Sequence, residues 1–91
     1  MSTQEAIEFY WRPGCPFCMG LERALSDAEV PFEKLNIWEN PDFAAFVRSV
    51  ADGNEVVPTV RIGESSLVNP NLDEVVQTMK AETPHLVPAG R

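Results

Sequence analysis

The chain is short of positive charge and of long apolar runs. Its 91 residues include 7 Lys and Arg against 14 Asp and Glu, which gives a formal net charge of -7. The phosphate backbone of a nucleic acid would be repelled, and the scattered basic residues form no patch, so we expect no nucleic-acid partner. No stretch is long and apolar enough to cross a bilayer, and we expect no membrane partner either.

Histidine and cysteine are also scarce, with one histidine, His85, and two cysteines, Cys15 and Cys18. One chain cannot fill a tetrahedral zinc site with these residues, so we expect no bound metal or other cofactor. A metal or iron–sulfur carrier module shared between two chains stays open as an alternative. The polar start Met1–Glu5 and the short apolar run after it do not form a signal peptide, which favours a cytoplasmic protein.

Apolar residues recur with strand or helix periods in the order βαβαββα. We expect strands over residues 6–11, 32–38, 56–62 and 65–68, and helices over residues 16–29, from Pro41 to a stop at Asp52-Gly53-Asn54, and from Leu72 onward. This order predicts an α/β fold with a four-stranded mixed sheet flanked by three helices. The length allows one domain, which we expect over residues 1–82, followed by a flexible C-terminal tail over residues 83–91.

Both cysteines lie where the first predicted strand gives way to the first predicted helix. Pro16 suits the first helical position, which puts Cys15 at or beside the N-cap. Free backbone N–H groups and the helix dipole favour a thiolate there, and in such sites the thiol pKa falls from about 8.5 to about 3.5–7.5. Cys18 belongs to an apolar stripe with Leu21, Leu25 and Ala28. We therefore expect a solvent-exposed, nucleophilic Cys15 and a buried, resolving Cys18, although core packing alone would also explain Cys18.

For several residues around this motif, an ordinary structural role is an alternative to a functional one. Arg12 is the only cation near the cysteines, and it could hold the thiolate or a ligand carboxylate, or be an ordinary surface cation. Phe17, between the cysteines, is the aromatic residue most expected to be exposed, whereas we expect Trp38 to be packed. Asn69 is expected first of all as a helix cap.

Two features together resemble the glutaredoxin branch of the thioredoxin fold, over roughly Ile7 to Met79. They are Cys15-Pro16-Phe17-Cys18 after the first strand and Val57-Pro58 at the head of the third. The runs Phe46–Val50, Val56–Val60 and Leu67–Pro70 further resemble mycoredoxins, the glutaredoxin-like proteins that work with mycothiol in place of glutathione. Ordinary glutaredoxins hold glutathione with a Gly-Gly kink and a Ser-Asp pair at a place where this chain has Val68-Asn69-Pro70-Asn71.

The resemblance implies a thiol–disulfide oxidoreductase in which Cys15 attacks a mixed disulfide of mycothiol, and a second mycothiol or Cys18 then releases it. It also implies a thiol-binding surface and a cis Val57–Pro58 bond that faces Cys15, with the Val57 backbone offered to an extended substrate. The residues of this expected surface are Arg12, Pro16, Phe17, Val57, Pro58 and Asn69.

We expect a monomer whose partners are a low-molecular-weight thiol and disulfide-bearing proteins. The reducing co-substrate is expected to be mycothiol rather than glutathione. The alternative within the same class of enzyme is a dithiol electron donor that is reduced by thioredoxin reductase.

Overall fold

A computed structural model describes residues 4–90, and the elements follow the predicted order βαβαββα. The strands are β1 (Ile7–Trp11), β2 (Phe32–Asn36), β3 (Thr59–Ile62) and β4 (Ser65–Val68). The helices are α1 (Pro16–Asp27), α2 (Pro41–Val50) and α3 (Leu72–Glu82), followed by the 3-10 helix η1 (Pro84–Leu86). Three strands are shorter than predicted: β1 begins one residue later, at Ile7, the chain turns at Ile37-Trp38 after β2, and β3 begins only after Pro58.

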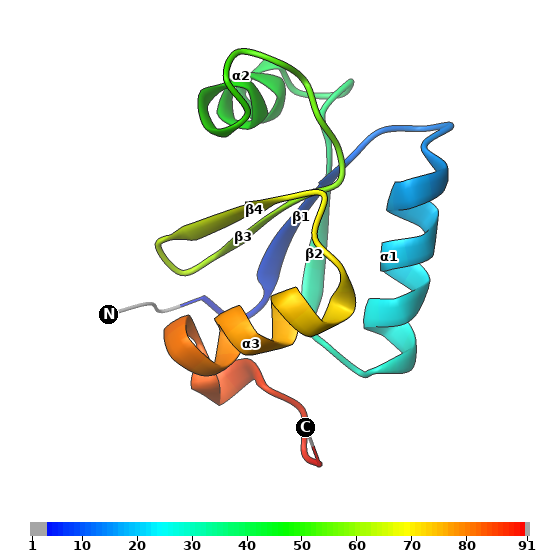
Figure 1. Cartoon of the computed structure of the whole chain (residues 1–91). Helices are drawn as coiled ribbons and strands as arrows, with labels where there is room; N and C mark the ends of the chain where they lie inside the picture. Colours follow the sequence, from blue (N-terminus) through cyan, green and yellow to red (C-terminus); the bar gives the residue numbers. More distant parts are fainter. Residues whose placement is uncertain (1–3, 91) are drawn as a thin grey trace.

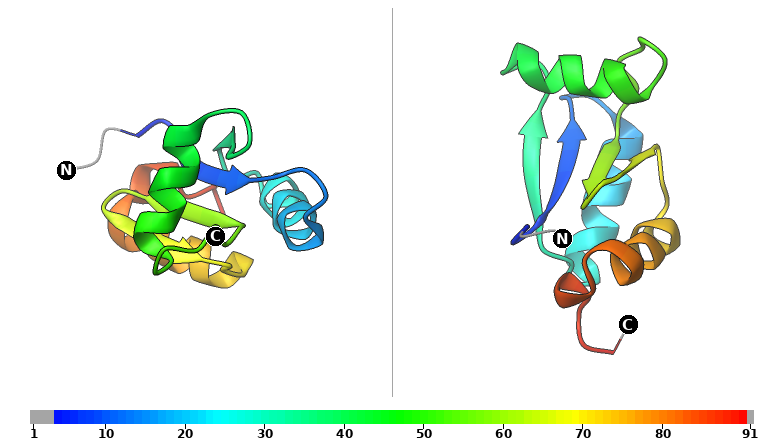
Figure 2. Two further views of the ribbon diagram at one scale, coloured as in Figure 1. Left: turned by 90° about the horizontal axis from the view of Figure 1, so that it is seen from above. Right: turned by 90° about the vertical axis from the view of Figure 1, so that its left-hand side faces the viewer.

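The four strands form one mixed sheet in the order β2-β1-β3-β4 (Figure 1). β1 runs parallel to β2 and antiparallel to β3, and β3 and β4 form an antiparallel hairpin. Figure 2 shows α2 lying across one end of the strands, away from α3 at the other end. The predicted four-stranded mixed sheet with three flanking helices is therefore confirmed.

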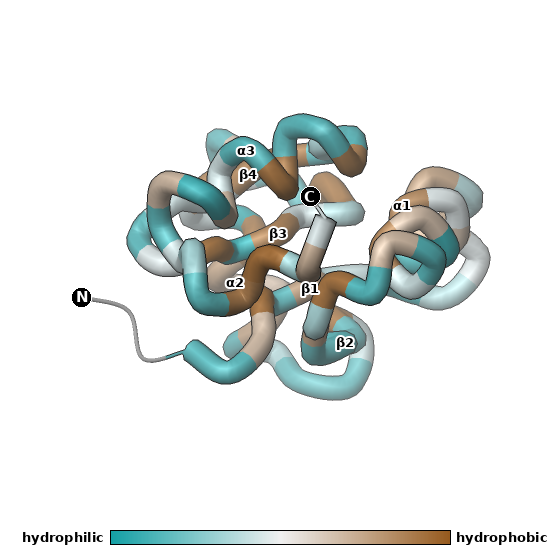
Figure 3. Tube along the Cα trace, turned by 90° about the horizontal axis from the view of Figure 1, so that it is seen from below, coloured by the Kyte–Doolittle hydropathy of each residue, from teal (hydrophilic) through white to brown (hydrophobic). Residues whose placement is uncertain are grey.

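The sheet separates two apolar clusters. On one face, Ile7 and Phe9 of β1 pack with buried residues of α1, β3 and α3, whereas Tyr10 of β1 turns to the other face and packs against α2. The Tyr10 ring stacks on the ring of Phe46, and the two ring centroids lie 4.8 Å apart. The strict alternation along β1 thus covers both faces of the sheet, as expected for a central strand. Figure 3 shows apolar stretches along β1 and β3 and mostly hydrophilic loops between the elements.

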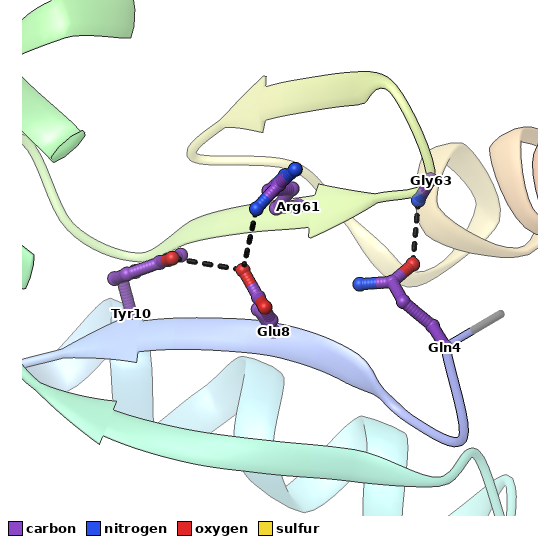
Figure 4. A network of polar contacts seen from close by, with 5 residues as sticks. All are labelled: Gln4, Glu8, Tyr10, Arg61 and Gly63. Atoms are coloured by element: carbon purple, nitrogen blue, oxygen red, sulfur yellow. Dashed lines mark hydrogen bonds and ion pairs between the residues drawn. The ribbon is translucent and has the colours of Figure 1, made fainter. Parts of the chain in front are cut away.

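A polar network joins β1 to β3 (Figure 4). The Tyr10 hydroxyl donates a hydrogen bond of 2.9 Å to Glu8 Oε1, and Arg61 Nη1 lies 3.5 Å from the same oxygen. Burial, and then the bond to the Glu8 carboxylate, raise the pKa of the Tyr10 phenol above its ordinary value. Nearby, the Gly63 amide donates to Gln4 Oε1 at 2.6 Å. These contacts hold the N-terminal segment and the β3–β4 hairpin in register.

The end of α1 differs from the prediction, since the helix ends at Asp27 rather than at residue 29. The Val30 amide donates to Leu25 O and the Glu29 amide donates to Ser26 O, both at 3.0 Å. This bond pair is a Schellman motif, which needs a left-handed residue after the helix, and Glu29 has that conformation with a φ of 61°.

The start of α3 also corrects a prediction, because Asn71 and not Asn69 is the N-cap. The Asn71 side chain accepts a hydrogen bond of 2.8 Å from the Glu74 amide, and the Glu74 carboxylate accepts one of 3.0 Å from the Asn71 amide. This reciprocal pair is a capping box. Asn69 lies in the preceding turn with a φ of 51°.

The segment after residue 82 is not the irregular tail that we predicted. Thr83 and Leu86 are buried, Leu86 belongs to the larger apolar cluster, and Val87 packs against it. His85 Nε2 lies 2.8 Å from the backbone oxygen of Gln4, so this segment also meets the other end of the described chain. The packed structure therefore extends past the predicted boundary; Arg91 and residues 1–3 lie outside the described residues.

Candidate functional site

Cys15 lies at the N-cap of α1, as predicted. Its backbone is extended, with φ -104° and ψ 103°, and Pro16 follows at the start of the helix. Gly14, with a φ of 74°, makes the turn that leads from β1 into this position. The Cys15 Sγ accepts a hydrogen bond of 3.1 Å from the Cys18 amide. A free N–H of the first helical turn is thus aimed at the sulfur, where it would stabilise negative charge.

Cys15 and Cys18 form a disulfide bond, with their Cα atoms 5.2 Å apart. They are the only cysteines of the chain, so the structure represents its oxidised form. Cys18 is buried with 1% of its surface exposed, on the inner face of α1 beside Leu21 and Leu25. The predicted burial of Cys18 is confirmed.

The predicted exposure of Cys15 is wrong for this oxidised form, because only 3% of the residue is accessible. The N-cap position turns the side chain back toward the helix, where its sulfur joins Cys18. Val57 covers it from another part of the chain, with its carbonyl oxygen 3.8 Å from the Cys15 Sγ. What is exposed at this site is the rim, above all Phe17 at 72%.

The Val57–Pro58 peptide bond is cis, as the resemblance implied. It lies just before β3, and Pro58 is held by the turn before α3, since the Asn69 amide donates a 2.7 Å hydrogen bond to Pro58 O. Three distant segments, around Cys15, Pro58 and Asn69, therefore meet at one place.

A groove of about 390 Å³ opens beside this meeting point, between α1 and the turn that precedes α3. Three of the predicted thiol-binding residues line it, namely Pro16, Phe17 and Asn69. Every side chain that lines the groove is uncharged, and the polar ones are the amides of Asn69 and Asn71. The arrangement suits a ligand part that is uncharged and partly apolar.

Arg12 and Trp38 lie together at the ends of β1 and β2, outside the lining of the groove. The Arg12 guanidinium carbon is 5.8 Å from the centroid of the Trp38 ring, and Arg12 Nη1 donates to Pro13 O at 3.2 Å. Trp38 is 64% exposed, so the expectation that it is packed was wrong. The turn after β2 buries Ile37 and thereby presents the next side chain outward. In the sequence, the one signal that Trp38 is exposed was the apolar Ile37 before it, beside a run of polar residues.

For residues 4–90, two features were absent: a cluster of metal-ligating side chains and a membrane-spanning helix. Within this part of the chain, no group of three or more His, Cys, Asp and Glu side chains is placed to hold a metal ion. The helices described there are also too short and too polar to cross a bilayer.

Comparison with known proteins matches residues 7–67 to a family model described as glutaredoxin. A provisionally named glutaredoxin of Mycobacterium tuberculosis is 38% identical over 71 residues, which cover 77% of this chain and 84% of that protein. Mycoredoxin 1 of Corynebacterium glutamicum is 30% identical over 76 residues, which cover 82% of this chain and 94% of that protein. Among solved structures, the glutaredoxin-like NrdH-redoxin of Escherichia coli superposes with a TM-score of 0.60 at 30% identity, covering 69% of this chain and 80% of that one.

Proposed function

The chain belongs to the glutaredoxin family, and we propose that it is a thiol–disulfide oxidoreductase that reduces mixed disulfides between mycothiol and proteins or small molecules. The observation that carries this proposal is the Cys15–Cys18 disulfide at the N-terminus of α1. A disulfide that closes so short a loop restricts the unfolded chain little, so stabilising the fold is a poor explanation for it. Exchange chemistry is the better one.

The cycle begins from the dithiol form. The Cys15 thiolate attacks the mycothiol sulfur of a mixed disulfide, so a new bond joins Cys15 to mycothiol while the substrate leaves as a thiolate and takes up a proton. A second mycothiol thiolate then attacks that mycothiol sulfur, which gives mycothiol disulfide and restores the Cys15 thiolate. Alternatively, Cys18 attacks Cys15, releases mycothiol and forms the disulfide seen here. The first route consumes one free mycothiol and leaves the substrate's own mycothiol in the mycothiol disulfide. In the second route the two cysteines supply the two electrons, and two further mycothiol molecules then reduce the Cys15–Cys18 disulfide and form mycothiol disulfide, which closes the cycle.

The groove beside the site supports mycothiol over glutathione. Glutathione ends in a γ-glutamyl group that carries an ammonium and a carboxylate, and burying such charges without partners is costly. The groove offers uncharged side chains instead: the Asn69 amide could exchange hydrogen bonds with hydroxyl groups, while Pro16 and Phe17 give apolar contact. The polyhydroxylated part of mycothiol suits such a lining.

A coupled assay tests the proposal. The purified protein is offered a mycothiol mixed disulfide together with mycothiol, mycothiol disulfide reductase and NADPH, and NADPH consumption is followed. We expect turnover that disappears in Cys15→Ser, and a mixed disulfide with mycothiol on Cys15 by intact mass. Absence of turnover with mycothiol, alongside turnover with glutathione or thioredoxin reductase, would defeat the mycothiol assignment.

A dithiol electron donor reduced by thioredoxin reductase is the second candidate. It is supported by the disulfide itself and by the likeness to NrdH-redoxin, whose structure is described as explaining a thioredoxin-like activity profile. Such a donor needs both cysteines. A Cys18→Ser variant that still reduces mycothiol mixed disulfides favours the first function, and one that is inactive favours the second.

A further inference from the structure

Gly20 is a glycine that the fold itself does not explain. The other four of the five glycines have a positive φ, which disfavours a side chain, and they are Gly14, Gly53, Gly63 and Gly90. Gly20 instead lies inside α1, where any residue adopts the backbone. A Cβ at this position would have no other part of residues 4–90 within 4 Å, its own stretch of helix aside. The fold therefore has room for a larger residue there.

A glycine inside a helix also weakens that helix. It loses more backbone freedom on folding than alanine does, and it ranks near the bottom of the helix propensity scale. The neighbours Met19, Leu21 and Glu22 are all good helix formers. Because Gly20 lowers the stability of α1 and avoids no clash within the fold, we look for its role outside the fold.

The empty space beside Gly20 belongs to the groove of about 390 Å³ next to the disulfide. On the α1 side this groove is lined by Pro16, Gly20 and Ala24, which follow one another at steps of four residues and so share one face of the helix. From Pro16 to Ala24 the helix rises by about 12 Å. The groove therefore begins beside Cys15 and continues along α1, and Gly20 lies at the middle of this wall.

The dimensions and the lining of the groove suit a small molecule. Its volume falls within the range of about 300–1,000 Å³ that is usual for small-molecule sites. Opposite α1 it is lined by Asn69, Asn71 and Leu72, which combine amides with an apolar side chain. The helix cap uses Asn71 Oδ1, and the NH2 group of that amide takes no part in the cap. Such a wall can donate hydrogen bonds to hydroxyl oxygens and contact the carbon atoms of a ring.

We propose that Gly20 is a specificity-determining residue, which keeps the groove open so that the polyhydroxylated rings of mycothiol can lie against α1. The mycothiol sulfur would meet Cys15 at one end of the groove, and the rings would pass over Gly20 toward Ala24. This inference rests on the proposed oxidoreductase function, since it names the residue by which the same site selects its low-molecular-weight thiol.

The test compares two mixed disulfides of one dye-labelled cysteine peptide. One is formed with mycothiol and the other with 2-mercaptoethanol, which has a thiol but no rings. The protein is reduced to its dithiol form and used in excess with no other thiol, so that each experiment follows a single reduction. The rate of peptide release against protein concentration gives an apparent Kd and a maximal rate. For the wild type we expect the apparent Kd to be about tenfold lower for the mycothiol mixed disulfide, the effect of one or two hydrogen bonds.

Three variants locate the selection on α1. Gly20→Leu should raise the apparent Kd for the mycothiol mixed disulfide at least about fivefold, the lower end of what an overpacked contact costs. It should leave the apparent Kd for the 2-mercaptoethanol mixed disulfide and both maximal rates unchanged. Gly20→Ala adds only a methyl group and should act in the same direction by less. Ser26→Leu adds a leucine at an exposed position of α1 outside the groove lining and should behave as wild type.

Thermal unfolding separates a role in selection from a role in the fold. Gly20→Ala should raise the Tm by about 2–8 °C while it weakens the binding of mycothiol, because alanine is the better helix former. A lower Tm in Gly20→Ala would overturn the claim that the fold does not need this glycine.

The inference and the function fail in different ways. A mycothiol preference that is intact in Gly20→Leu would overturn the inference and leave the proposed function standing. An equal rise of both apparent Kd values would mean that the peptide occupies the groove, and would also overturn the inference. A wild type that reduces both mixed disulfides without preference would overturn the mycothiol assignment and this inference together, and one that reduces neither would overturn the oxidoreductase function itself.

Discussion

Asn69 and Asn71 flank Pro70, and from the sequence either could cap α3. We predict that substitution of Asn71 lowers the stability of the fold, whereas substitution of Asn69 raises KM. Asn71 caps α3 through a reciprocal pair of hydrogen bonds with Glu74. Asn69 is exposed, has a left-handed backbone, and lines the groove between α1 and the turn before α3. Asn71→Ala tests the cap, and Asn69→Gly removes a groove amide while keeping a backbone that accepts positive φ.

The expected sizes follow from these contacts. Asn71→Ala should lower the free energy of unfolding by about 1 kcal/mol, within the range of about 0.5–2 for lost caps. Asn69→Gly should change it by less than about 0.5 kcal/mol, as is usual for exposed positions. Asn69→Ala should cost roughly 1 kcal/mol, because alanine lacks the short polar side chain whose local hydrogen bonds let asparagine adopt the left-handed region.

Urea unfolding and kinetics with a mycothiol mixed disulfide measure the two roles separately. A domain of this length has about 5–14 kcal/mol of stability, so a loss of 1 kcal/mol is measurable and leaves the protein folded. Asn69→Gly should raise KM about two- to tenfold at unchanged kcat, the loss of one hydrogen bond, whereas Asn71→Ala should alter KM much less. Equal stability losses in both variants, or an unchanged KM in Asn69→Gly, would refute this division of roles.

Three further predictions concern the scaffold. Glu29→Gly should raise the free energy of unfolding by about 0.5–1 kcal/mol in urea, since it relieves a left-handed residue at the end of α1; a loss would contradict the Schellman assignment. Leu86→Ala should lower it by about 2–5 kcal/mol, and a loss below about 1 would mean that the last segment is not packed. Tyr10 is the only tyrosine, so a phenolate absorbance titration reports it alone and should show no ionisation near pH 10 in the folded protein. Because the pKa of the Tyr10 phenol is raised on folding, this group contributes stability that is complete below about pH 10 and is lost as pH rises toward the folded pKa. A phenolate that forms near pH 10 without unfolding would contradict the buried hydrogen bond to Glu8.

The sequence correctly predicted those features of the fold that depend on neighbouring residues in the chain. Pro16 predicted the start of α1 and the N-cap position of Cys15. Ile7 and Phe9 on one face of the first strand, with Tyr10 on the other, predicted a strand covered on both faces. Each of these features is decided within a few residues, by a missing N–H or by the side-chain period of a strand.

The exposure of Cys15 could not be predicted in the same way. The atom that lies over its sulfur belongs to Val57, 42 residues away, and no local pattern reports that approach. The same limit explains Leu86, whose proline-bounded surroundings are typical of a loose tail, while its burial depends on the larger cluster of the whole domain. Asn69 and Asn71 were ambiguous because both are good N-caps, and the capping box with Glu74 selects Asn71.

Reactivity and substrate selection are coupled through one chain of contacts. Cys15 meets the Val57 carbonyl at 3.8 Å, and the adjoining Pro58 carbonyl accepts the Asn69 amide at 2.7 Å, so the groove turn and the sulfur share a support. A change that removes only the Asn69 side chain leaves this support intact and should act on binding alone. A change that forces the Asn69 backbone out of its left-handed conformation moves Pro58, and with it the wall that covers Cys15. Asn69→Ala should therefore lower kcat as well as raise KM, whereas Asn69→Gly should raise KM alone, because the Asn69–Pro58 hydrogen bond joins the groove turn to the wall over Cys15.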